Sequence, residues 1–74
     1  MPDNYGLTVR ELEVLQRVAA GDTDKELAIR LQIACGTAKS HMRNIVEKLH
    51  ARNRTHAVVI ALVDGLIAIE APHA

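Results

Sequence analysis

The chain has 74 residues, no net charge with histidine neutral and one cysteine, Cys35, so we expect a single small domain without an internal disulfide. Tyr5 is the only aromatic residue, which removes the usual stacking surface for single-stranded nucleic acid. Because no apolar run reaches the roughly 18 residues of a membrane span and the first residues do not resemble a signal peptide, we expect a cytoplasmic protein with no membrane partner.

The first predicted helix covers residues 9–20 and follows a flexible leader or linker end over residues 1–7. The leader contains proline and glycine and has no hydrophobic periodicity. Thr8 and Glu11 have the T-x-x-E spacing of a capping box, in which each side chain accepts a hydrogen bond from the other residue's amide. Gly21 follows the helix and favours the left-handed conformation that ends helices.

A second, shorter helix is predicted over residues 24–31, where Thr23 and Glu26 repeat the capping-box spacing. Residues 32–36 leave room only for a turn before the next helix begins. Two helices joined by so short a turn are typical of a helix-turn-helix motif.

The third predicted helix, over residues 37–50, has two different faces. Apolar side chains at helical spacing form the face expected in the core: Ala38, Met42, Ile45, Val46 and Leu49. Polar and cationic residues form the opposite face and its shoulders: Gly36, Thr37, Lys39, Ser40, His41, Arg43, Asn44 and Lys48. Such a helix suits a DNA groove, because its central donors can meet base edges while its flanking groups meet phosphates.

Charge is distributed unevenly along the chain. Residues 24–54 hold seven cationic and three acidic residues, whereas residues 1–23 and residues 55–74 each carry a net charge of −2. Because a polyanion responds to the local field more than to the net charge, the basic middle of the chain favours a nucleic-acid partner.

A fourth helix is predicted over residues 55–68, capped by its first threonine, so that the domain spans residues 8–68 and residues 69–74 form a tail. This helix is apolar nearly all round, which is typical of burial on more than one side. Its small residues suit packing within the domain. Its second apolar stripe is expected to form a symmetric dimer interface: Thr55, Val59, Leu62, Val63 and Leu66. The alternative is that both sides close the domain's own core.

Five motifs in the same order resemble the LuxR/NarL-type helix-turn-helix of bacterial transcription regulators, over about residues 7–67. They are L-T-x-R-E at Leu7–Glu11, K-E-L-A at Lys25–Ala28, G-T-x-K-S-H at Gly36–His41, K-L at Lys48–Leu49 and N-R-T-x-A at Asn53–Ala57. The resemblance implies an all-α, four-helix domain that binds the major groove of double-stranded DNA with its third helix. It also implies dimerisation through the fourth helix on near-palindromic operators, with RNA polymerase as a further candidate partner.

Transferred to this sequence, the resemblance implies base contacts by Lys39, Ser40 and Arg43. It implies phosphate contacts by residues of the second helix, the third helix and the following connector: Lys25, Thr37, His41, Lys48, Asn53, Arg54 and Thr55. It implies no cofactor and no small-molecule ligand in this domain. The resemblance implies that the chain is either the C-terminal output domain of a response regulator or a small regulator that acts alone.

Three positions depart from the family pattern. Ala34 stands where a serine usually caps the third helix, a loss that costs about 0.5–2 kcal/mol unless a neighbour substitutes. Ala38 stands where valine is usual, and its smaller side chain would loosen the fit against the second helix. His56 replaces a commonly polar or acidic residue; it either makes pairing pH-sensitive or is an exposed side chain of little consequence.

Enzymatic and metal-binding functions find little support in the residues. Cys35 and His41 are the only candidate nucleophile and base, and helical counting places them about 240° apart. The histidines lack the spacing of metal ligands, so we predict no enzyme and no metal site: His41, His50, His56 and His73.

Two other binding functions compete with operator recognition. A protein-interaction module is favoured by the near-zero charge and the apolar fourth helix, but the polar face of the third helix lacks apolar anchors. The promoter-reading helix-turn-helix of sigma factors shares the R-E and E-L-A features, and the long apolar fourth helix argues against it.

Overall fold

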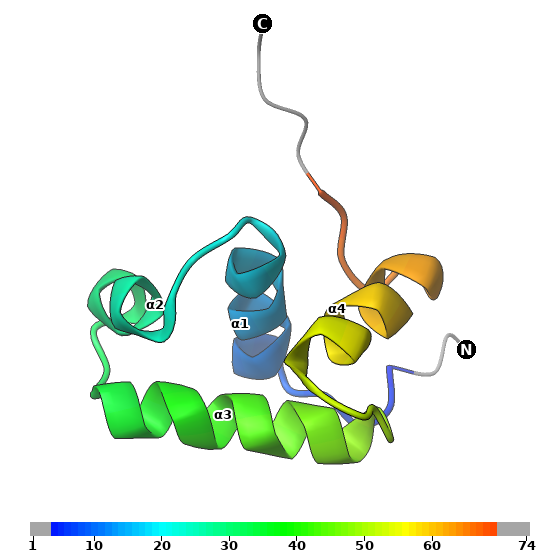
Figure 1. Cartoon of the computed structure of the whole chain (residues 1–74), viewed down its shortest axis with the longest axis horizontal. Helices are drawn as coiled ribbons and strands as arrows, with labels where there is room; N and C mark the ends of the chain where they lie inside the picture. The colour runs from blue at the N-terminus through cyan, green and yellow to red at the C-terminus, as the bar shows by residue number, and fades with distance from the viewer. Residues whose placement is uncertain (1–3, 70–74) are drawn as a thin grey trace, which may run out of the picture.

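The protein is described by a computed structural model over residues 4–69, which contains four helices and no strands: α1 (Val9–Ala19), α2 (Asp24–Leu31), α3 (Cys35–Lys48) and α4 (Arg54–Val63). The predicted all-α, four-helix class is therefore confirmed. Figure 1 shows α3 along one edge of the molecule, with α2 beside its first residues, α1 near its middle and α4 near its end. None of these helices is long and apolar enough to cross a membrane. The part of the tail from residue 70 onward, with His73, lies outside the described residues.

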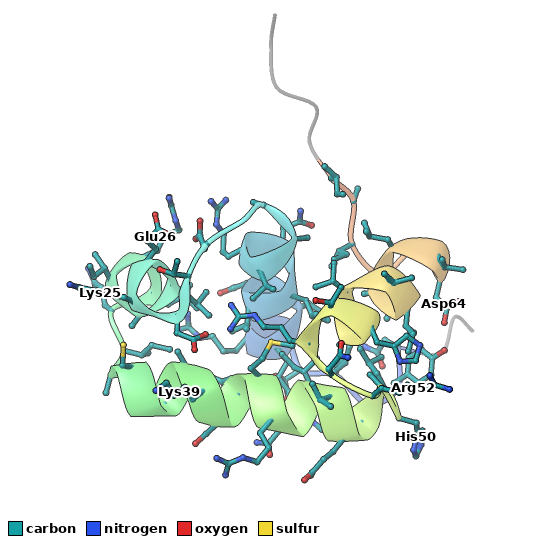
Figure 2. The ribbon with its side chains drawn as sticks, viewed as in Figure 1. Lys25, Glu26, Lys39, His50, Arg52 and Asp64 are labelled. Atoms are coloured by element: carbon teal, nitrogen blue, oxygen red, sulfur yellow. The ribbon has the colours of Figure 1, made fainter. Side chains whose placement is uncertain are left out.

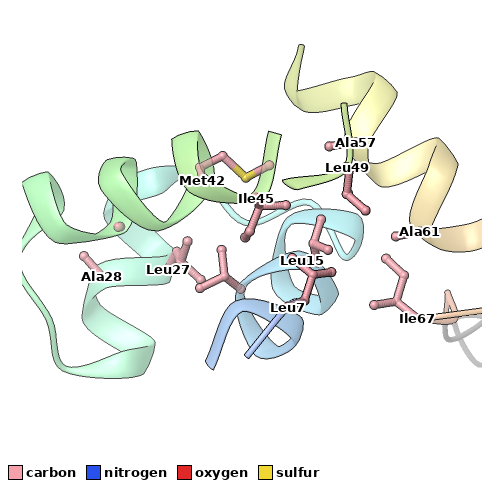
Figure 3. Close-up of a cluster of buried hydrophobic side chains, with 12 residues drawn as sticks. Leu7, Leu15, Leu27, Ala28, Met42, Ile45, Leu49, Ala57, Ala61 and Ile67 are labelled. Atoms are coloured by element: carbon pink, nitrogen blue, oxygen red, sulfur yellow. The ribbon is translucent and has the colours of Figure 1, made fainter. Parts of the chain in front are cut away.

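Aliphatic side chains from all four helices form one core, shown in Figure 3. The largest side chains that are fully buried are Val14, Leu15, Leu27 and Ile45. The apolar face predicted for the third helix is confirmed, because four of its five residues are buried and Val46 is half-buried. Ala38 is fully buried against this core.

The core also includes residues that precede α1 and residues that follow α4 in the sequence. A turn closed by a hydrogen bond of 3.0 Å from the Leu7 amide to the Asn4 carbonyl precedes α1, and Leu7 is buried. At the other end, Ile67 is buried after α4 has ended. Residues 4–7 were expected to belong to a flexible leader, but in the structure they form this turn and supply one core side chain.

The helix starts follow the local sequence signals in part. Both predicted capping boxes, at Thr8 and at Thr23, are present with both of their hydrogen bonds. Ala34 occupies the cap position of α3 and provides no side-chain hydrogen bond, as its sequence predicts. The predicted cap of the fourth helix was wrong, because Asn53 and not Thr55 caps α4, accepting a hydrogen bond of 2.9 Å from the His56 amide.

The third and fourth helices end earlier than predicted. His50 adopts a left-handed conformation with φ +54°, and the Ala51 amide donates to the Val46 carbonyl over 3.0 Å, so α3 stops at Lys48. Gly65 has φ +72° and ends α4 at Val63 in the same way. The apolar pattern continues beyond both points because the residues after each turn return to the core. The third helix also begins earlier than predicted, at Cys35.

Candidate nucleic-acid interface

One face of α3 is turned away from the other helices, as Figure 1 shows, and the side chains on it include nitrogen and oxygen atoms, as Figure 2 shows. Its exposed residues are the predicted ones: Gly36, Thr37, Lys39, Ser40, Arg43 and Asn44. Within residues 4–69, the side chains of Lys39, Ser40 and Arg43 form no hydrogen bond or ion pair. Their donors are therefore available to an external ligand.

A groove of about 420 Å³ runs beside this exposed face, lined by Asp24, Lys39, Met42, Arg43, Val46, Glu47 and Arg54. The groove is bounded on one side by α3 and on the other by the first residues of α2 and α4. Two of the predicted base contacts thus share a surface with Arg54, a predicted phosphate contact.

The other predicted phosphate contacts are spread around this surface. Lys25 is exposed and lies at the outer side of α2 in Figure 2, while His41 is half-buried on α3. Asn53 is exposed and caps α4. Thr55 is exposed and lines a second hollow between the end of α1 and the start of α4. Their contacts with phosphate stay predictions.

Lys48 has a structural partner that the sequence analysis missed. Its ammonium lies 2.7 Å from Oε1 of Glu11 and 3.1 Å from the Gly6 carbonyl oxygen. Glu11 is 4% exposed and the Lys48 side chain is 35% exposed, so this ion pair joins the start of α1 to the end of α3 at the edge of the core. The ammonium has three N–H donors and the Lys48 side chain is 35% exposed, so one donor is left for an external acceptor. The predicted phosphate contact of Lys48 stays a prediction, with Glu11 as its partner in the free domain.

A second group of ion pairs joins three segments near the first residues of α2. The Asp22 carboxylate accepts hydrogen bonds from Arg17 over 3.0 Å and from Arg30 over 3.1 Å. Arg54, at the start of α4, lies 2.5 Å from the Asp24 carboxylate. Sequence reasoning missed these pairs because their partners are brought together only by the fold.

Acid is expected to destabilise the domain through two of these carboxylates. Burial raises the pKa of Glu11, but the hydrogen bonds from Lys48 and Thr8 outweigh it, so the pKa lies below its usual value. The hydrogen bond from Arg17 lowers the pKa of Asp22, and the hydrogen bond from Arg30 adds to this effect. Burial raises the pKa, but the two hydrogen bonds outweigh it. A lowered pKa in the folded state contributes stability above the unfolded-state pKa, and this stability is lost as the pH falls.

We therefore expect the melting temperature to fall as the pH drops below about 4.5, the range in which free carboxyls titrate. Circular dichroism melts at successive pH values would measure this. The Glu11→Gln variant should show a shallower fall, because it no longer carries one of the two groups. A wild-type melting temperature that stays constant down to about pH 3 would contradict the assignment.

The chain is similar in sequence and in structure to known proteins. Residues 5–61 match the model of the family described as GerE, bacterial regulatory proteins of the luxR family. The chain is 42% identical over 67 residues to the uncharacterized transcriptional regulatory protein YvfU of Bacillus subtilis, covering 90% of this chain and 34% of that protein. It is 41% identical over 61 residues to the response regulator protein VraR of Staphylococcus aureus, covering 82% of this chain and 29% of that protein.

Among solved structures, the chain is similar to the transcription factor GerE. The two share 30% of their residues with a TM-score of 0.83, over 86% of this chain and 96% of that one. The chain thus spans about a third of the length of the curated relatives but nearly all of this structural neighbour.

Proposed function

Since the chain belongs to the luxR family of bacterial regulatory proteins and contains its DNA-binding helix-turn-helix, we propose that it recognises specific sites on double-stranded DNA with α3. The carrying observation is the exposed face of α3, where Lys39, Ser40 and Arg43 have no protein partner within residues 4–69. Arg43 can donate two hydrogen bonds to a guanine, and Lys39 can reach a guanine or a phosphate. Ser40 can donate or accept and contributes less discrimination.

Phosphates on either side of the major groove of DNA are proposed to contact exposed or half-buried residues around α3: Lys25, Thr37, His41, Lys48, Asn53, Arg54 and Thr55. Such contacts fix the orientation of the domain and are independent of sequence. No catalytic activity and no cofactor are proposed.

A second copy of the chain is proposed to pack against α4. Val59 is 47% exposed and Val63 is 78% exposed, and both lie on the predicted dimer stripe with Thr55, Leu62 and Leu66. Leu62 and Leu66 are half-buried against the core, so the shared surface would consist of their outer edges and the two valines. Two-fold pairing through this surface would present two copies of α3 to a near-palindromic operator.

Replacing Val59 with glutamate is expected to abolish pairing, because it places a charge in an apolar interface. Sedimentation of the protein alone and with an operator duplex should show two wild-type chains per duplex and one variant chain. Ile29→Glu is a matched control, because Ile29 is 70% exposed on α2, away from the proposed interface. A Val59→Glu variant with the wild-type stoichiometry would refute the interface.

The proposed function is tested by selection of bound sequences from a pool of random duplexes. We expect an inverted repeat with half-sites about one helical turn apart, and fluorescence anisotropy should show affinity falling steeply with salt. If no sequence is enriched at any salt concentration, α3 does not read bases. The protein-interaction function would then explain the exposed polar face better.

Regulation by an additional domain is also proposed, because the relatives are about three times as long as this chain and one of them is named a response regulator. In such a protein a receiver domain would control the activity of this domain in the bacterial cytoplasm. RNA polymerase remains a candidate partner.

A further inference from the structure

The groove beside α3 contains carboxylates as well as cations. Asp24 and Glu47 line it together with Lys39, Arg43 and Arg54. A carboxylate facing a DNA backbone repels it, so the two acidic residues require an explanation within a DNA-binding surface. Glu47 forms no ion pair with any residue of the described chain, whereas Asp24 binds Arg54 directly.

The ion pair between Asp24 and Arg54 occupies the cation that is expected to meet a phosphate. Arg54 Nη1 lies 2.5 Å from Asp24 Oδ1, and Nη2 lies 3.3 Å from the backbone carbonyl oxygen of Asp22. The side chains are 36% and 27% exposed, so an ion arriving in the groove can reach both. Carboxylate and phosphate oxygens accept hydrogen bonds from a guanidinium in the same geometry. Asp24 and a DNA phosphate therefore compete for the same donors.

We propose that Asp24 is an internal competitor for DNA phosphate at Arg54 and lowers the affinity of the groove for duplex DNA. This inference rests on the proposed function. In the free domain the Asp24 carboxylate accepts the hydrogen bond of the Arg54 guanidinium. When DNA binds, the phosphate either displaces the carboxylate from the guanidinium or is repelled by the charge of the carboxylate. Because phosphates are the same at every step of the duplex, Asp24 restrains specific and non-specific binding alike.

Asp24→Asn tests this while preserving the geometry. The asparagine side-chain oxygen still accepts from Arg54, and the Asp22 carbonyl still holds the second nitrogen. We expect the variant to bind both an operator duplex and a random duplex about fivefold more tightly at moderate salt, measured by fluorescence anisotropy. Circular dichroism should show an unchanged helix content.

Two variants with the same change of charge separate local from general effects. Glu13→Gln removes the partner of Arg10 on α1, outside the groove, and should leave affinity nearly unchanged. Glu47→Gln removes a carboxylate within the groove that holds no cation, and its gain should be smaller than that of Asp24→Asn. In an Arg54→Gln background the gain from Asp24→Asn should fall to the level seen for Glu47→Gln.

Any one of four results would overturn the inference. Weaker binding by Asp24→Asn would make Asp24 a positioning residue for Arg54. A gain no larger than that of Glu13→Gln, or a full gain in the Arg54→Gln background, would remove the competition for Arg54. If the wild-type protein binds no duplex at any salt concentration, the proposed function fails and this inference fails with it. Wild-type binding without a gain in the variant contradicts this inference alone.

Discussion

Replacing Glu11 with glutamine is expected to lower the free energy of unfolding by about 2–3 kcal/mol. The Glu11 carboxylate is 4% exposed and accepts hydrogen bonds from the Lys48 ammonium and the Thr8 amide. Glutamine keeps an acceptor for the Thr8 amide but removes the charge that compensates the ammonium. Since a domain of this size has roughly 4–11 kcal/mol of stability in total, the loss is a large fraction of it. Chemical denaturation followed by circular dichroism would measure the change.

Two comparisons decide whether the ion pair is responsible for this loss. Glu13→Gln breaks an exposed pair with Arg10 on the same helix and should cost less than about 0.5 kcal/mol. Lys48→Met leaves the buried carboxylate without its cation and should cost at least as much as Glu11→Gln. The double variant should lose less than the sum of the two, because its members remove the same interaction. Additive losses would show that Glu11 and Lys48 stabilise the domain independently.

Replacing Arg43 with alanine is expected to cost about 1–3 kcal/mol of binding to the selected operator and to relax selection at one base position. Arg43 is exposed on α3, lines the groove and has no partner among the described residues, so its removal should leave the fold intact. Binding to random duplexes should weaken much less, because those complexes lack the base contact. Selection repeated with the variant would identify the affected position.

Lys25→Ala is the matched comparison for Arg43→Ala. Lys25 is also an exposed cation, but it lies on α2 and is proposed to contact phosphate. Its loss should weaken all duplexes similarly and reduce the salt slope by roughly one, without changing the selected sequence. Equal effects of the two variants on operator and random DNA would contradict the division between base contacts and phosphate contacts.

Much of the fold could be predicted because its signals are local. The spacing of Thr8 with Glu11 and of Thr23 with Glu26 located two helix starts, and both capping boxes are present. The apolar residues of the third helix identified its buried face because a helix repeats every 3.6 residues.

The helix ends were less predictable because residues beyond a turn can still be buried. Ile67 continues the apolar pattern of α4 and is buried, although the helix ends at Val63. His50 adopts a left-handed conformation that is uncommon for residues other than glycine, and the sequence analysis did not predict it.

The candidate interface was predictable to the extent that it lies on one helix. The exposure of Lys39, Ser40 and Arg43 follows from helical periodicity alone. The ion pairs of Lys48 with Glu11 and of Arg54 with Asp24 were not predictable, because 37 and 30 positions separate their partners along the chain. Each of these ion pairs gives a predicted phosphate contact a partner within the domain.

The most direct test of DNA recognition by α3 is a nuclear magnetic resonance titration of the isotope-labelled protein with a short duplex. If α3 enters the major groove of the duplex, the largest changes in amide chemical shift should lie in residues 36–44, with smaller changes at the starts of α2 and α4. The amides of α1 should change little, because that helix contributes to the core and does not line the groove beside α3. Shifts centred on another surface, with residues 36–44 unchanged, would contradict recognition of DNA by α3.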